Sequence, residues 1–223
     1  KSLMWARIFL GGVFVGAPVA YHTWNVEEKR KLKLLNESRR KPLVSIDDLA
    51  ADKLNPGDIL VFERDCSSLH LPYAAHCIMT KKLLGDSLNH LAIVVNHPQS
   101  YDPAVLEALP FEGVRLTMFQ ERIDDGDSVQ AVLLPLNLSR GDKNRRERIA
   151  ERLRQFTLMA TSTTTMPTSA KDAVGLVLNA YIKAKLLEPD PRLSVMTPND
   201  IASGSLQLTE TAKLGAQVPL RAR

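Results

Sequence analysis

Two cysteines, one histidine and one glutamate could together support thiol chemistry in this chain. Cys66 and Cys77 are its two cysteines, His90 begins an apolar run, and Glu107 lies inside the next such run. A neighbouring histidine lowers the pKa of a thiol, and the resulting thiolate is the attacking species. These residue types raise three hypotheses, which are a thiol hydrolase, a zinc site and a disulfide.

The cysteines themselves do not fit a catalytic or zinc-binding pattern. A zinc site would use Cys66, His70, His76 and Cys77, but the spacing C-x3-H-x5-H-C matches no common zinc arrangement. We therefore expect no metal and no other cofactor. Cys66 follows the first apolar run and is expected in a loop, without a matched base. A Cys66–Cys77 disulfide would require an oxidising compartment.

Five short apolar runs predict the strands that would position these side chains. A strong turn signal, Asn55-Pro56-Gly57-Asp58, precedes the first of them. The runs are residues 59–62, 91–95, 105–108, 113–116 and 129–136. Because short stretches with turn residues separate most of them, we expect an antiparallel sheet or a small barrel. Helical periodicity follows over residues 142–160 and 169–187, so the predicted fold class is α+β.

The order of four motifs resembles the permuted NlpC-type peptidases of the papain-like superfamily, a group that includes lecithin retinol acyltransferase. The motifs are Pro-Gly-Asp-Ile-Leu-Val-Phe at 56–62, Asn-His-Leu-Ala-Ile-Val at 89–94, Val-Leu-Glu-Ala at 105–108 with Gly113-Val114, and Met-Thr-Pro-Asn-Asp-Ile at 196–201. The similarity covers about residues 50–205. It implies a small antiparallel sheet or barrel with packed helices.

The same resemblance assigns roles to three positions. His90 corresponds to the histidine that activates the catalytic cysteine, and Glu107 to the polar residue that orients its ring. In the permuted group the cysteine comes last, at the start of a helix, and the corresponding residue here is Ala170. Thr168 and Ser169 are adjacent, but one residue along a helix rotates the side chain by about 100°. The resemblance thus implies a vestigial site without its nucleophile.

Positive charge is concentrated at the beginning of the chain. The whole sequence has 29 basic and 25 acidic residues. Nine of the basic and three of the acidic residues lie within 1–43, which leaves the remainder slightly acidic. Aromatic residues make up 5% of the sequence. A near-neutral domain with few aromatic side chains gives no support for nucleic-acid binding.

An uncharged stretch near the start predicts one membrane-spanning helix. Residues 8–21 carry no charge, and Trp5 and Trp24 flank them at a spacing that suits the two bilayer interfaces. The alternatives are the apolar part of a signal peptide and a buried core helix. Small residues four positions apart would share one face of the helix and allow close contact with a partner helix. These residues are Gly12, Gly16 and Ala20.

A basic run follows the predicted span and is expected to contact lipid headgroups or a partner. Its residues are Lys29, Arg30, Lys31, Lys33, Arg39, Arg40 and Lys41. The excess of basic residues on this side predicts that the domain lies in the matrix or cytosol. Taken alone, the run also raises the alternative of a peripheral lipid-binding module.

The sequence therefore predicts a membrane anchor followed by a papain-like domain. The divisions are an anchor at 1–24, a charged helical linker at 25–43, the domain at 44–205 and a tail at 206–223. We interpret the chain as an inactive accessory subunit of a mitochondrial inner-membrane complex, such as a respiratory complex or the ATP synthase. Its partners would be other subunits and membrane lipids, with the domain on the matrix side. The alternative is an active, anchored thiol hydrolase or acyltransferase that acts on amides or lipids.

Overall fold

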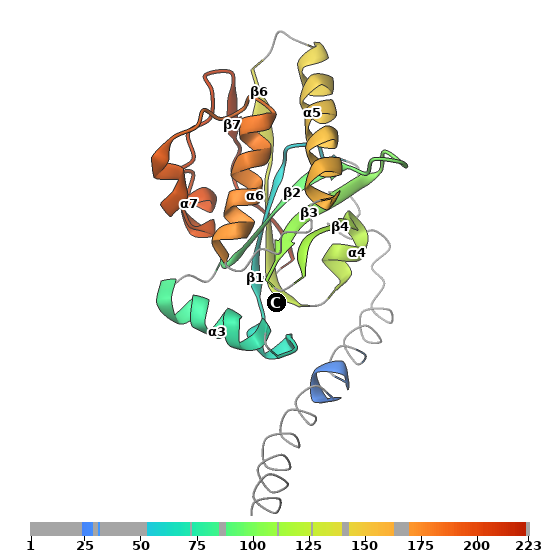
Figure 1. Ribbon diagram of the computed structural model, residues 1–223, viewed down its shortest axis with the longest axis vertical. Helices are drawn as coiled ribbons and strands as arrows, with labels where there is room; N and C mark the ends of the chain where they lie inside the picture. Colours follow the sequence, from blue (N-terminus) through green and yellow to red (C-terminus); the bar gives the residue numbers. More distant parts are fainter. Residues whose placement is uncertain are drawn as a thin grey trace, which may run out of the picture.

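A computed structural model describes most of the region after residue 52. The described residues are 24–28, 31, 53–71, 73–84, 88–110, 112–125, 127–139, 143–162 and 170–221. Figure 1 shows a sheet at the centre of this region with helices packed around it. The α+β class predicted from the sequence is confirmed.

Six antiparallel strands form the main sheet, in the order β4-β3-β2-β1-β5-β8. Their bounds are β1 Ile59–Arg64, β2 His90–Asn96, β3 Pro103–Leu109, β4 Gly113–Met118, β5 Ser128–Leu134 and β8 Val218–Arg221. Two short strands, β6 Leu136–Leu138 and β7 Ala212–Leu214, pair separately. All five predicted strands are present.

Two long helices cover one face of the sheet, and shorter elements complete the fold. They are α5 Lys143–Ser162 and α6 Ala170–Lys183, which lie side by side (Figure 1). The other elements are α3 Tyr73–Leu84, α4 Phe119–Asp124, α7 Pro198–Ala202 and the 3-10 helices η1 Cys66–Ser68 and η2 Pro191–Val195. The sequence predicted α5 and α6 but not α3 or α4, because α3 buries few apolar side chains and α4 is too short to show periodicity.

Both faces of the central strands are covered, which explains their unbroken apolar runs. Successive side chains of a strand point to opposite faces. Leu91 and Ile93 therefore pack in the core beneath α5 and α6, whereas Ala92 and Val94 pack in a second core with residues of α4. A strand that is buried on both sides reads as a continuous apolar segment rather than an alternating one.

The turn before β1 joins three parts of the fold. Gly57 has a φ of +100°, and a Cβ atom there would lie 2.7 Å from Leu136 Cδ2. The buried Asp58 carboxylate accepts hydrogen bonds from the backbone N–H groups of Leu136, at 2.7 Å, and Asn55, at 2.9 Å. The hydroxyl of Tyr181 in α6 donates to the Gly57 carbonyl. The turn motif therefore connects β1 to β6 and α6.

The C-terminal segment belongs to the domain, in contrast to the tail predicted at 206–223. Strand β8 pairs with β5 at the edge of the main sheet, and β7 pairs with β6. Leu220 of β8 is buried in the core on the α4 side of the sheet. The strand signal is weak because β8 has four residues, one of which is Pro219.

The predicted membrane anchor lies almost entirely outside the described residues. This holds for Gly12, Gly16, Ala20 and the basic run, except that Lys31 is described, helical and exposed. Residues 24–28 are also helical. In the described ranges, no helix is both long enough and apolar enough to cross a bilayer.

Two glycine substitutions test the role of the turn. We expect Gly57→Ala to reduce the free energy of unfolding by about 1–3 kcal/mol, because the new methyl group overlaps Leu136 at a φ that favours glycine. Gly175→Ala in α6 is the control, because nothing lies within 4 Å of its Cβ position. It should be neutral or stabilise by about 0.5–1 kcal/mol. Urea unfolding measures both, and equal effects of the two substitutions would contradict this account.

Candidate functional site

His90 and Glu107 are paired, as the sequence predicted. The register aligns Ala92 of β2 with Glu107 of β3, so His90 at the start of β2 is a diagonal neighbour of Glu107. His90 Nε2 lies 2.8 Å from Glu107 Oε2, and both side chains are buried. The pair therefore has the geometry of an imidazole oriented by a carboxylate.

Three arginines, which sequence reasoning missed, complete a buried ionic network around this pair. Arg115 of β4 donates to Glu107 Oε1 at 2.7 Å, and Arg122 of α4 donates to Glu107 Oε2 at 3.0 Å. Arg122 also bonds to Asp127 Oδ1 at 2.9 Å, and Arg64 of β1 bonds to Asp127 Oδ2 at 2.7 Å. The one sequence signal was an acidic residue inside an apolar strand, which needs hydrogen bonds or an opposite charge when it is buried.

Arg122 is the centre of this network. Its side chain is 1% exposed, and its guanidinium carbon lies 4.3 Å from the centroid of the Phe62 ring. The aromatic face and two carboxylates therefore surround a cation that burial would otherwise disfavour. Its Nη2 atom is buried and has no hydrogen-bond partner in the described structure.

Burial and the neighbouring charges set the protonation states. Burial alone would raise the pKa of Glu107, but Arg122, His90 and Arg115 hold it well below its usual range. Burial lowers the pKa of His90, with smaller contributions from Arg64 and Arg122, although Glu107 acts in the opposite direction. His90 is therefore neutral at neutral pH. Because an ionised carboxylate only accepts hydrogen bonds, the His90 proton is on Nε2.

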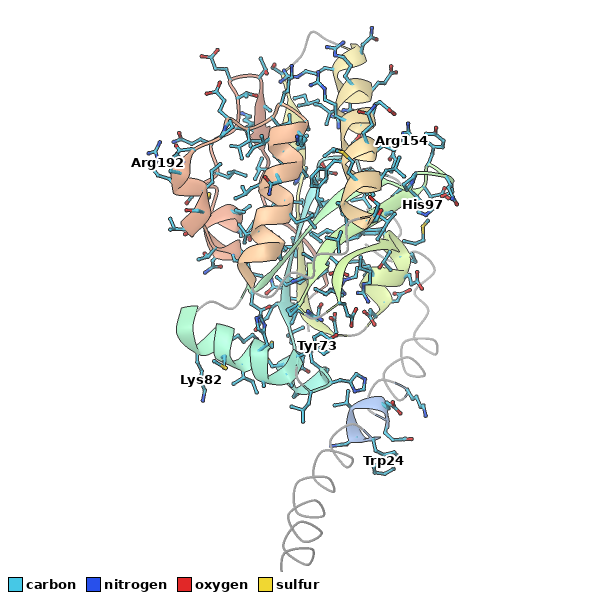
Figure 2. The ribbon with its side chains drawn as sticks, viewed as in Figure 1. Trp24, Tyr73, Lys82, His97, Arg154 and Arg192 are labelled. Carbon is cyan, nitrogen blue, oxygen red and sulfur yellow. A yellow bond between two sulfur atoms is a disulfide. The ribbon has the colours of Figure 1, made fainter. Side chains whose placement is uncertain are left out.

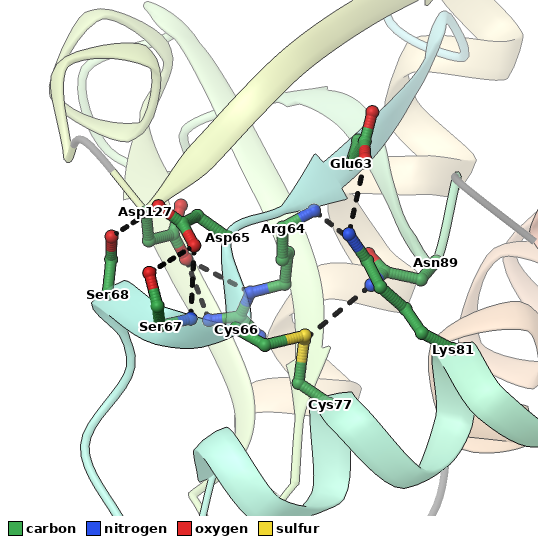
Figure 3. Close-up of a disulfide and its surroundings, with 10 residues drawn as sticks. All are labelled: Glu63, Arg64, Asp65, Cys66, Ser67, Ser68, Cys77, Lys81, Asn89 and Asp127. Carbon is green, nitrogen blue, oxygen red and sulfur yellow. Dashed lines mark hydrogen bonds and ion pairs between the residues drawn. A yellow bond between two sulfur atoms is a disulfide. The ribbon is translucent and has the colours of Figure 1, made fainter.

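Both cysteines are joined in a disulfide (Figure 3). Cys66 lies in η1 and Cys77 in α3, and Asn89 Nδ2 lies 3.6 Å from Cys77 Sγ. A disulfide sulfur is neither a thiolate nucleophile nor a zinc-binding thiolate. The disulfide hypothesis is the one that this geometry supports, and the zinc site is contradicted.

A cavity of about 30 Å³ borders His90, and among the described residues that line it none offers a free thiol or an aliphatic hydroxyl. The disulfide-bonded Cys77 contributes to its wall, and so does Ala173 of α6. No serine or threonine is among the described residues that line it. Tyr73 also lines the cavity, but its hydroxyl donates to Glu112 at 2.8 Å, and burial with that hydrogen bond raises its pKa to about 12.

The helix expected to carry the nucleophile begins where the resemblance placed it. Helix α6 starts at Ala170, whose side chain lies outside what is described. Ala173 is one turn later on the same face and supplies a methyl group to the His90 cavity. Because side chains alternate along a strand, His90 lies on the same face of the sheet as Ala92 and Val94, opposite α6. His90 is the first residue of β2, and it is at this end of the strand that its ring and Ala173 of α6 line the same cavity.

Comparison with known proteins adds no relative. No family model, no curated protein and no solved structure matches the chain. The NlpC-type resemblance therefore stays a prediction based on the four motifs and on the paired His90 and Glu107.

Removing the central carboxylate tests whether the network is structural. We expect Glu107→Gln to reduce the free energy of unfolding by about 3–5 kcal/mol at pH 7, because it leaves a buried arginine under-compensated. The exposed Glu121→Gln in α4 is the control and should change it by no more than about 0.5 kcal/mol.

The pH dependence gives a second measurement on the same variants. Glu107 and Asp127 have folded-state pKa values below their unfolded values of about 4.3 and 3.9. Their stabilisation is complete above those unfolded values and is lost as the pH falls towards the folded values. Urea unfolding between pH 3 and pH 7 should show a shallower acid dependence for Glu107→Gln than for the unmodified chain. An unchanged dependence would refute the assigned charge states.

Proposed function

We propose that this chain is a catalytically inactive relative of the papain-like NlpC-type enzymes that serves as an accessory subunit of a membrane complex. The observation that carries the proposal is that His90 is oriented by Glu107, while the described residues around its cavity include no free thiol, serine or threonine. Both cysteines are oxidised, and the wall formed by α6 is alanine. In this proposal, His90 is the retained base, and the cysteine nucleophile of the family is absent.

The size of the cavity supports the same conclusion. Sites for small molecules have volumes of roughly 300–1,000 Å³, whereas the cavity beside His90 has about 30 Å³. That volume accommodates water and not an amide or acyl substrate. The network around Glu107 is therefore better explained as part of the folded structure than as a working site.

The role as a subunit rests on the predicted anchor. A single span with Gly12, Gly16 and Ala20 on one face suits a helix that packs against another membrane helix. A mitochondrial inner-membrane complex, such as a respiratory complex or the ATP synthase, remains the setting that we propose. The basic run at 29–41 would contact headgroups or neighbouring subunits.

Two observations disagree about the side of the membrane. The basic run favours the matrix or cytosol. The disulfide favours an oxidising compartment, such as the intermembrane space. The charge rule is a statistical bias, whereas a reducing compartment acts directly on the bond. We therefore propose the oxidising side for the domain instead of the matrix side.

An active thiol hydrolase or acyltransferase is the second candidate, and one observation favours it. Cys77 lines the same cavity as His90, so reduction of the disulfide would place a thiol beside a histidine that Glu107 already orients. This candidate requires the reduced chain and enough space for a substrate. The accessory-subunit proposal requires neither.

Thiol labelling separates the two candidates. When intact cells are alkylated before lysis, we expect Cys66 and Cys77 to stay unlabelled until a reductant is added, because they are joined. After reduction, both should react with a thiol-directed activity probe at the rate of an ordinary thiol, with no effect of His90→Ala. Labelling of Cys66 and Cys77 without reductant would instead support the matrix side for the domain. Rapid labelling of Cys77 that is lost in His90→Ala would overturn the inactive assignment.

Enlarging the small residues of the anchor tests assembly. We expect the Gly12→Leu/Gly16→Leu double variant to dissociate from its complex in mild detergent, because the larger side chains prevent close helix contact. Leucine in place of Val13 and Val15, on other faces of the helix, is the control and should leave the chain bound. Native gel electrophoresis with mass spectrometry measures retention. Full retention of the glycine variant would remove the support for a packing face.

A further inference from the structure

A large groove lies in the C-terminal part of the domain, apart from the His90 cavity. It has a volume of about 920 Å³ and runs between η2 and residues 205–211, beside α7 and β7 in the orange and red part of Figure 1. None of its lining residues lines the cavity of His90. A second cavity of about 460 Å³ shares Pro189, Asp190, Leu193 and Met196 with it and continues towards α6. These volumes are large enough for a ligand.

One wall of the groove is a stretch of main chain without hydrogen bonds. The N–H of Ser205 donates to the Asp200 carbonyl, and the N–H of Thr209 donates to the Leu186 carbonyl. Between them, Leu206–Leu208 makes no hydrogen bond in the described structure. The N–H and C=O groups of these three residues therefore have no partner within the described structure. An extended peptide that lies alongside can pair them as an added strand does.

A buried hydroxyl in the same groove also lacks a partner. Thr209 lines the groove, and its Oγ1 atom is buried without a hydrogen bond. A hydroxyl can both donate and accept, and leaving it unpaired costs free energy. Thr209 directly follows Leu206–Leu208, and all four residues line the groove, although Thr209 Oγ1 itself is buried behind the surface.

The other lining groups define the chemistry of the occupant. Leucine and methionine side chains provide apolar surface, and two carboxylates, Glu188 and Glu210, stand at the rim with no ion-pair partner in the described residues. Arg192, which points outward in Figure 2, is already bound to Asp190 at 2.7 Å. Arg145 also approaches the groove, where it donates to the Thr211 carbonyl at 3.3 Å. The charged residues that line the groove are three acidic and one basic, so the acidic excess complements a lysine or arginine.

We propose that this groove binds an extended segment of a partner polypeptide that carries apolar side chains and at least one lysine or arginine. The main chain of that segment pairs with Leu206–Leu208, its apolar side chains contact the leucines and methionine, and its cation lies near Glu188 and Glu210. The inference rests on the groove alone, so it holds whether or not the chain is an inactive enzyme or a mitochondrial subunit.

Defined peptides test the proposal on the full chain in detergent. The probes are fluorescent, end-blocked octapeptides with leucine and valine at alternate positions and either lysine or glutamate between them. A third probe is the lysine peptide with N-methyl groups along one edge of its backbone. By fluorescence anisotropy, we expect the lysine peptide to bind at least about tenfold more tightly than the glutamate peptide, which corresponds to about 1.4 kcal/mol. N-methylation should weaken binding by a similar factor, since it removes main-chain donors.

Charge reversal locates the binding site. Glu188→Lys/Glu210→Lys should reverse the preference in favour of the glutamate peptide. Glu121→Lys/Glu147→Lys has the same change in net charge at exposed sites outside the groove and should retain the lysine preference. Absence of binding, equal binding of the two peptides, no effect of N-methylation, or the same response in both double variants would each overturn the proposal. Displacement of the peptide by added phospholipid, or by self-association of the chain, would assign the groove to a lipid or a second copy instead.

Discussion

The buried ion pair between Glu107 and Arg122 joins most of one face of the sheet. Glu107 lies on β3 and Arg122 on α4, and each is at most 1% exposed. Through Glu107 the pair reaches Arg115 on β4 and His90 on β2, and through Asp127 it reaches Arg64 on β1. Two faces of the sheet are thus stabilised in different ways. The face under α5 and α6 is an apolar core, whereas this end of the opposite face depends on mutually compensating charges, because removing one leaves its buried partners under-compensated in a low-dielectric environment.

The same network determines what His90 can do. Burial and the nearby arginines keep its ring neutral, and Glu107 fixes its orientation. A neutral, oriented imidazole is also what a general base requires, but the position of His90 is accounted for by its contact with Glu107 in the network. Replacing Glu107 would remove a partner of Arg122, and replacing His90 would remove a partner of Glu107, so either change would cost stability.

The sequence predicted the parts of this structure that depend on local pattern. The five strands follow from apolar runs between turn residues, and α5 and α6 follow from helical periodicity. The pairing of His90 with Glu107 came from the resemblance and is confirmed by their 2.8 Å contact. The arginine partners were not predictable, because Arg64, Arg115 and Arg122 approach Glu107 and Asp127 only after four elements have come together. Strand β8 was missed for a related reason, since a short edge strand with a proline acquires its conformation from β5. The free main chain of Leu206–Leu208 likewise has no signature in composition.

The disulfide links the redox environment to the surroundings of His90. Helix α3 buries little apolar surface, and its small core consists of Leu69, Ala74 and Cys77 with Cys66 and Tyr73 beside them. The bond closes a separation of 11 residues, and a loop of that size contributes roughly 3 kcal/mol by restricting the unfolded chain. The attachment of α3 therefore depends more on the bond than on packing. Tyr73, His76 and Cys77 of α3 line the His90 cavity, so the bond that attaches α3 also fixes one of its walls. The disulfide thus helps to hold the wall beside His90, while Glu107 and its arginine partners hold the orientation of the ring.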